Sequence, residues 1–84
     1  MSKQRKSRLL LVEDSVALTR VYQEYLKPMP VKFSSVLEGG QGLEQIEQTD
    51  PDVVLLDLNL PDMNGLELLA KLKELPQDPT VVVI

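Results

Sequence analysis

The chain has 84 residues, of which 43% are hydrophobic and 26% are charged, and these values indicate one small globular domain. Cysteine and histidine are both absent, which excludes disulfides, thiolate metal sites and acid–base chemistry that depends on histidine. No apolar run approaches the length of a membrane span, and the basic start lacks the apolar region of a secretory signal. We therefore expect a cytoplasmic protein with no membrane contact.

The net charge of −4 is unevenly distributed along the chain. Four basic residues lie among the first eight, which leaves five basic and thirteen acidic residues in the rest. A body this acidic repels a phosphate backbone, so we predict that the domain does not bind nucleic acid directly. We interpret residues 1–7 as a basic, flexible N-terminal arm and residues 8–84 as the folded domain.

The first two predicted elements are a strand and a helix. Residues 8–12 are strand-like, and their apolar part, Leu9 to Val12, is followed by Glu13 and Asp14. Residues 15–27 follow with apolar side chains at helical spacing, and Pro28 ends this helix. The apolar positions of the helix are Leu18, Val21, Tyr22, Tyr25 and Leu26, and we expect the two tyrosines to contact the core or a groove.

The next pair of elements is less strongly marked. Pro30 precedes an alternating segment at residues 31–36, which predicts a short edge strand. Residues 40–48 predict a weak helix with Leu43 and Ile46 facing inward. The start of this helix is expected to be loose because glycine occupies positions 39, 40 and 42.

The third pair carries the strongest pattern. Residues 52–56 predict a strand whose apolar run, Val53 to Leu56, is typical of a central parallel strand buried on both faces, and Asp57 follows at its carboxyl end. Asn64 is a suitable N-cap for the next helix, while we expect Asp62 to be a solvated loop acid. The broad apolar face of that helix comprises Leu66, Leu68, Leu69, Leu72 and Leu75.

Residues 80–84 predict a fourth strand after a proline-bounded turn at 76–79. Strands and helices thus alternate along the whole chain. Right-handed crossovers between parallel strands then give a doubly wound α/β sheet.

In such a sheet, ligands gather at the carboxyl ends of the strands, which is where Glu13, Asp14 and Asp57 are expected. Carboxylates held together repel one another unless a cation neutralises them, and a small site with oxygen ligands alone favours Mg²⁺. Asp57 is then the natural nucleophile toward a phosphoryl donor, forming an acyl phosphate. The alternative without a cation is that Glu13 and Asp14 merely begin a helix, where acidic residues are favourable anyway.

Two motifs connect the chain to a known family. The segments LLLVEDS at 9–15 and VVLLDLNLPDMNG at 53–65 resemble the receiver domains of bacterial response regulators, the CheY-like family. Pro61 and Gly65 follow Asp57 at the spacings of that family. The leucine-rich second motif looks closest to receivers of NtrC-type transcriptional activators.

The resemblance implies a flavodoxin-like sheet with strand order 2-1-3-4-5, of which this chain would supply four strands and three helices. It also implies that Asp57 accepts the phosphoryl group, that Glu13 and Asp14 hold Mg²⁺, and that Asn59 contributes its backbone carbonyl. The donor would be a sensor histidine kinase or phosphotransfer protein, and the receiver would control an output domain, most simply one that regulates transcription. It would be a signalling domain rather than an enzyme.

The family pattern also includes a Ser or Thr after strand four and a Lys after strand five, and the sequence ends before both. We therefore expect a receiver truncated after its fourth strand, with an output domain beyond Ile84 and with an uncovered strand that favours self-association. The main alternative is a receiver-like interaction module that works without phosphorylation. A flavin carrier and a haloacid-dehalogenase-type phosphatase fit poorly, because acids stand where the first needs a phosphate loop and Asn59 stands where the second needs an acid.

Overall fold

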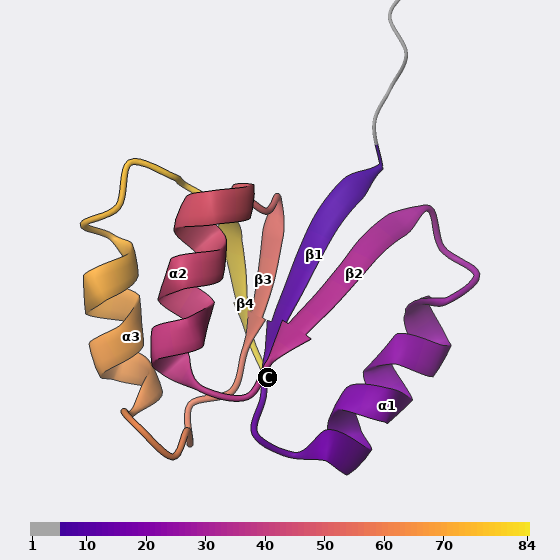
Figure 1. Ribbon diagram of the computed structural model, residues 1–84, viewed down its shortest axis with the longest axis horizontal. Helices are drawn as coiled ribbons and strands as arrows, with labels where there is room; N and C mark the ends of the chain where they lie inside the picture. The colour runs from indigo at the N-terminus through magenta and orange to yellow at the C-terminus, as the bar shows by residue number, and fades with distance from the viewer. Residues whose placement is uncertain (1–5) are drawn as a thin grey trace, which may run out of the picture.

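The computed structural model describes residues 6–84, and these form a four-stranded parallel sheet with three helices. Residues 1–5 of the predicted arm lie outside the described part, and Ser7, assigned to the arm, is the first residue of the sheet. The elements in chain order are β1 (Ser7–Val12), α1 (Val16–Leu26), β2 (Val31–Val36), α2 (Gly39–Thr49), β3 (Val53–Leu56), α3 (Gly65–Leu72) and β4 (Thr80–Val83) (Figure 1).

The strand order is β2-β1-β3-β4, which confirms the predicted order 2-1-3-4 and the predicted edge position of β2. All three strand pairs are parallel. Because all neighbouring strands run in the same direction, their carboxyl ends lie at the same edge of the sheet.

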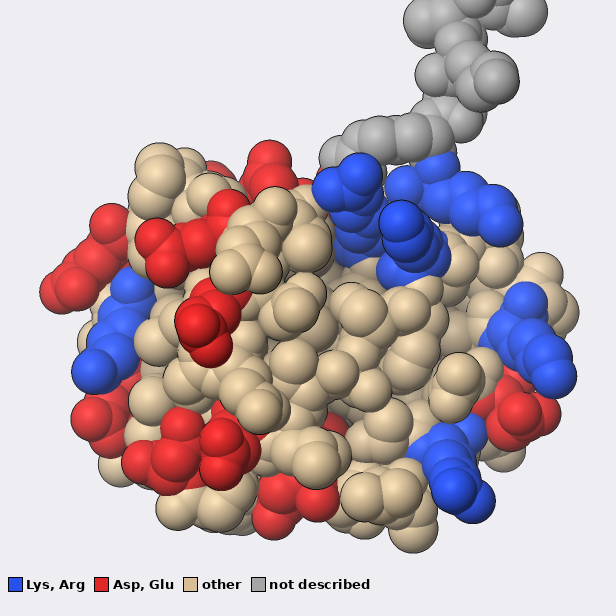
Figure 2. Space-filling model, in the orientation of Figure 1, with Lys and Arg blue, Asp and Glu red and all other residues tan. Residues whose placement is uncertain are grey.

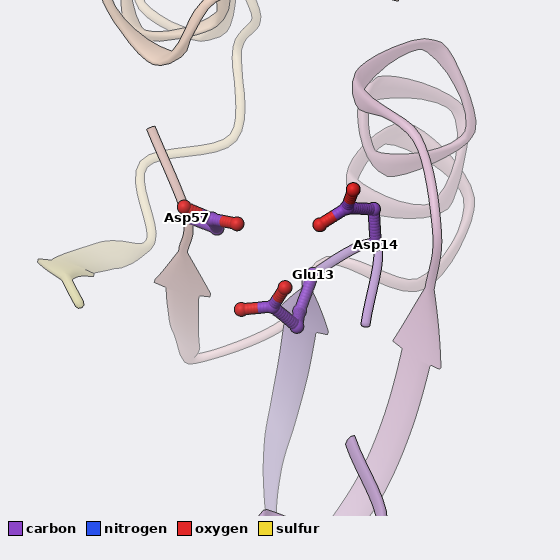
Figure 3. A group of neighbouring side chains, drawn as sticks. All are labelled: Glu13, Asp14 and Asp57. Atoms are coloured by element: carbon purple, nitrogen blue, oxygen red, sulfur yellow. The ribbon is translucent and has the colours of Figure 1, made fainter. Parts of the chain in front are cut away.

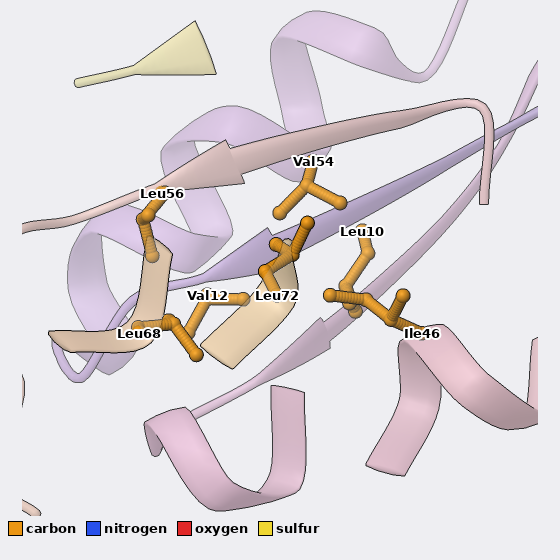
Figure 4. Close-up of a cluster of buried hydrophobic side chains, with 7 residues drawn as sticks. All are labelled: Leu10, Val12, Ile46, Val54, Leu56, Leu68 and Leu72. Carbon is orange, nitrogen blue, oxygen red and sulfur yellow. The ribbon is translucent and has the colours of Figure 1, made fainter. Parts of the chain in front are cut away.

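The helices divide between the two faces of the sheet, with α2 and α3 on one face and α1 on the other (Figure 1). The buried core lies between the sheet and the pair α2 and α3 (Figure 4). Alternate residues of β1 and β3 meet inward-facing residues of both helices there, because successive side chains of a strand point to opposite faces. The cluster comprises Leu10, Val12, Ile46, Val54, Leu56, Leu68 and Leu72.

The face covered by α1 is packed less completely than expected. None of the residues of α1 is buried, and Leu18, Val21 and Tyr25 are 48%, 47% and 78% exposed. Tyr25 is therefore not a core residue, whereas Tyr22 and Leu26 are half-buried. One helix over this face leaves the outer side of α1 without a packing partner among the described residues.

The same imbalance affects β3, which was predicted to be buried on both faces. Val54 and Leu56, on the face of α2 and α3, are fully buried, while Val53 and Leu55 are half-buried. An apolar run predicts a strand without revealing how many helices cover each side.

Helix α3 begins as predicted, because the Asn64 side chain accepts a hydrogen bond from the backbone N–H of Glu67 at 2.8 Å. Leu68 and Leu72 are buried, and Leu69 and Leu75 pack against the core. Leu66, assigned to the apolar face, is 72% exposed, since it points away from the sheet at the start of the helix. Among the described residues, no helix is long and apolar enough to cross a membrane.

Gly65 allows the first turn of α3 to lie directly against the preceding loop. A Cβ atom here would lie 2.6 Å from Cα of Leu58 and would also collide with that leucine's side chain. The two segments cannot separate without breaking the hydrogen bond from Gly65 N–H to the Leu58 carbonyl, which is 2.8 Å long.

We therefore expect Gly65→Ala to lower the free energy of unfolding by about 1–3 kcal/mol. Gly40→Ala is the matched control, because its Cβ would make only an ordinary 3.4 Å contact with Asp62 and alanine favours a helix. Urea unfolding measures both variants. A loss of stability in Gly40→Ala as large as in Gly65→Ala would contradict this account.

Candidate metal centre

The strand register brings two acidic residues together at the carboxyl edge of the sheet. Val12 of β1 pairs with Leu56 of β3, so the residues that follow, Glu13 and Asp57, leave the sheet at the same level. The ladder continues past the strand ends, because Asp57 N–H donates to the Val12 carbonyl at 3.0 Å. Glu13 N–H likewise donates to the Val36 carbonyl at 3.1 Å. The positions of both acids are thus determined by backbone hydrogen bonds.

Asp14 completes a group of three carboxylates. One oxygen each of Glu13, Asp14 and Asp57 can be chosen so that all lie within 4.8 Å of one another. Figure 3 shows the three side chains directed into a shared space between the ends of β1 and β3. Glu13 is buried, Asp57 half-buried and Asp14 exposed, so the space opens toward solvent on the side of Asp14.

Glu13 is the most constrained of the three acids. It is only 4% exposed, and its carboxylate accepts a hydrogen bond from Ser15 N–H at 3.0 Å. Burial raises the pKa of Glu13 above its ordinary value of 4.5, and the neighbouring Asp14 and Asp57 carboxyls raise it further, while the bond from Ser15 opposes the shift. The cluster is therefore electrostatically unfavourable when all three groups are ionised.

The first helix does not explain the acidic pair. Ser15 is the N-cap of α1, because its hydroxyl accepts a hydrogen bond from Leu18 N–H at 3.1 Å. Glu13 and Asp14 precede this cap, and the first turn of α1 contains no acidic residue. The alternative in which these two acids serve only to begin a helix is thus not what the structure contains.

The loop after Asp57 folds back on itself. The Asp57 carboxylate accepts a hydrogen bond from Asn59 N–H at 3.0 Å, and Asn59 forms an antiparallel bridge with Asn64. Gly65 N–H closes the loop on Leu58, as described above. This arrangement keeps Asn59 next to Asp57, where its carbonyl was predicted to contribute to the metal site.

Asp62, predicted to be a solvated loop acid, has a structural role that sequence reasoning missed. It is exposed, but its carboxylate oxygens accept hydrogen bonds from Gly39 N–H and Gly40 N–H, both at 2.8 Å. These bonds hold the first turn of α2, where the glycines led us to expect a loose start. Gly39 and Gly40 lie 23 and 22 residues before Asp62 in the sequence, and no local motif pairs them with it.

Acidic and basic side chains are unevenly distributed on the face shown in Figure 2. Figure 2 shows acidic side chains over the half with α2 and α3, and basic side chains gathered next to the N-terminal segment. Arg8, counted with the basic start, is half-buried in β1 and donates from its guanidinium to the Thr49 carbonyl at the end of α2 at 2.7 Å. Its role is to cap a helix C-terminus, which the sequence did not reveal.

The donor set fits a hard divalent cation. All three side chains offer carboxylate oxygens, which Mg²⁺ and Ca²⁺ prefer, and the cluster contains neither the sulfur nor the nitrogen that would select a softer metal. A cation here would remove the mutual repulsion of the acids. The open side at Asp14 would leave room for water and a phosphoryl group.

The chain has relatives among known proteins. The profile of the response regulator receiver domain matches residues 9–84. The chain is 39% identical over 85 residues to the nitrate/nitrite response regulator protein NarL of Escherichia coli K12, an alignment that covers 99% of this chain and 39% of NarL. It is 38% identical over 72 residues to the regulatory protein LuxO of Vibrio cholerae serotype O1, covering 86% of this chain and 16% of LuxO.

The fold agrees with these matches. A crystal structure of the signal receiver domain of a protein described as a LuxO repressor, from Vibrio parahaemolyticus, superposes with a TM-score of 0.89 at 35% identity. The superposition covers 95% of this chain and 61% of that domain. The chain thus spans less than two thirds of the relatives it matches. Its sequence and its four-stranded sheet show that it belongs to the response regulator receiver domain family.

Proposed function

We propose that this chain is the phosphoacceptor part of a two-component response regulator and that Asp57 receives the phosphoryl group. A sensor histidine kinase or a phosphotransfer protein would supply it, with Mg²⁺ held by Glu13, Asp14, Asp57 and the backbone carbonyl of Asn59. The observation that carries the proposal is the convergence of three carboxylates from two strand ends within 4.8 Å.

The chemistry is a single phosphoryl transfer. An oxygen of Asp57 attacks phosphorus of the donor phosphohistidine, a P–O bond forms as the P–N bond breaks, and the departing imidazole takes up a proton from water. Bound Mg²⁺ would neutralise charge on the phosphoryl oxygens. The chain's own contribution is to hold Asp57 at the open edge of the sheet, anchored through Asp57 N–H on Val12.

The consequence of the transfer would be a shift between two conformations. A phosphoryl group adds negative charge to an edge that is already acidic, which biases an existing equilibrium. We propose that an output domain beyond Ile84 reads this shift and regulates transcription, and the similarity to LuxO supports the link to NtrC-type activators. Signalling of this kind takes place in the cytoplasm and requires neither membrane contact nor binding of nucleic acid by this domain.

Two other functions have less support from the observed site. An interaction module that works without phosphorylation needs no complete acidic site, yet all three acids are present and grouped. A haloacid-dehalogenase-type phosphatase would need an acid at position 59, where this chain has Asn59. We therefore infer a signalling role in which Asp57 is modified rather than a catalytic role.

Asp57→Asn should abolish phosphorylation of the chain by acetyl phosphate and Mg²⁺, because an amide is a far weaker nucleophile than a carboxylate. Intact-mass spectrometry would detect the added phosphoryl group in the wild type and its absence in the variant. Asp78→Asn is the matched control, since it removes the same charge from the exposed loop before β4, at the other end of the strands. Modification that persists in Asp57→Asn would place the acceptor elsewhere.

The pKa shift of Glu13 predicts a pH dependence of stability. A carboxyl whose pKa is raised by folding binds more protons in the folded than in the unfolded state, so its contribution to stability falls as pH rises from about 4.5. In the absence of divalent ions, the free energy of unfolding of the wild type, measured relative to Glu13→Gln, should decline toward neutral pH. The glutamine retains an oxygen that can accept the bond from Ser15.

Mg²⁺ should then stabilise the wild type at neutral pH more than it stabilises Glu13→Gln, because ligand binding to the folded state adds to its stability. Urea titrations at several pH values, with EDTA or with excess Mg²⁺, provide both comparisons. A difference between the two proteins that stays constant with pH would contradict the proposed strain at Glu13.

We also propose that the 84-residue chain self-associates through β4. This strand pairs with β3 on one side only, and Val82, Val83 and Ile84 are 43%, 48% and 41% exposed. An apolar edge strand is a template for pairing with a second copy. Sedimentation at increasing concentration should give a mass above that of the monomer, and Val82→Lys should reduce it. A monomer mass at the highest concentration would refute the proposal.

A further inference from the structure

The tip of the loop between β3 and α3 is bound to the start of α2. The Oδ1 and Oδ2 atoms of Asp62 accept one hydrogen bond each, from Gly39 N–H and Gly40 N–H, at 2.8 Å. The N-cap residue of α2, Glu38, makes no capping bond with its own side chain. Asp62 therefore takes the place of a local cap, and the amide groups that are free at any helix N-terminus favour its negative charge.

An apolar contact lies beside this polar one. Gly39 has no side chain, and a Cβ atom at this position would lie 2.7 Å from Cγ of Met63. The loop and the helix can approach this closely only because glycine occupies position 39. Two consecutive loop residues, Asp62 and Met63, thus contact the first turn of α2.

The same loop contains the groups of the proposed metal centre. Its base is closed by the bond from Gly65 N–H to the Leu58 carbonyl and by the bridge between Asn59 and Asn64. Asn59 N–H is bonded to the Asp57 carboxylate. In the described part of the chain, the side-chain hydrogen bonds that connect the loop tip to another element are the two accepted by Asp62.

We propose that Asp62 is a positioning residue, whose two hydrogen bonds to the first turn of α2 hold the loop so that Asn59 faces Glu13, Asp14 and Asp57. This inference rests on the proposed function, because the orientation matters for Mg²⁺ and phosphoryl binding. It assigns a purpose to the contact beyond the capping of one helix. Residues outside a metal's own ligands commonly tune its affinity by orienting those ligands.

The test compares Asp62→Ala with Glu38→Gln in backbone NMR spectra of the whole chain. Both changes remove one negative charge near the start of α2, but only the first removes the bonds to Gly39 and Gly40. In metal-free protein, we expect Asp62→Ala to speed hydrogen exchange of these two amides about three- to tenfold. Its amide resonances at 57–60 should also shift, whereas those of Glu38→Gln should remain close to the wild type.

An Mg²⁺ titration supplies the second measurement. We expect Asp62→Ala to weaken Mg²⁺ binding about tenfold, and Glu38→Gln to change it much less. Asp62→Asn retains one acceptor oxygen and should give an intermediate loss, so it replaces the alanine variant if that protein fails to fold. A merely structural cap would lower stability without moving the resonances at 57–60.

Each outcome separates the two proposals. Faster exchange at Gly39 and Gly40 with unchanged resonances at 57–60 and unchanged Mg²⁺ affinity would overturn the positioning role and leave the metal centre intact. A wild type that does not bind Mg²⁺ would overturn the proposed function, while the resonances at 57–60 in metal-free protein would still decide whether Asp62 positions the loop.

Discussion

The pairing of β1 with β3 is the constraint on which the rest of the structure depends. Because Val12 lies opposite Leu56, the residues that follow these strands emerge side by side, and both are acids. A register shifted by one residue would turn every side chain of β3 to the other face, which would expose Val54 and Leu56 and move Asp57 away from Glu13. The buried cluster around these strands thus specifies the site as well as the fold, since its burial fixes the register.

The folded protein holds three mutually repelling carboxylates close together at this site. Three carboxylates within 4.8 Å oppose one another, and Glu13 is also buried, so its pKa is raised. The backbone bonds to Val12 and Val36 hold the acids in place despite this repulsion. A cation bound among these carboxylates would relieve the repulsion, so metal binding would be coupled to stability.

Much of this arrangement could be predicted from the sequence. The apolar runs before Glu13 and Asp57, together with helices between the strands, are enough to predict a parallel sheet with both acids at one edge. The exposure of Leu18 and Tyr25 could not be predicted, because helical spacing shows which side of a helix is apolar but not what covers it. Asp62 and Arg8 were missed for a related reason: each binds the backbone of a helix end far away in sequence, and backbone groups leave no signature in residue identity.

The contacts of the β3–α3 loop suggest how a change at the acceptor would spread. Asp57 holds one end of the loop through Asn59 N–H, and Asp62 holds the tip against α2. Phosphorylation of Asp57 would alter the charge and the geometry of the oxygens that accept the Asn59 bond. Because the loop is closed at its base by Gly65 and Leu58, it cannot absorb the change by unfolding locally without losing that bond. The strain would therefore act on α2 through Asp62, whereas α1, attached to the other face, shares no hydrogen bond with this loop among the described residues.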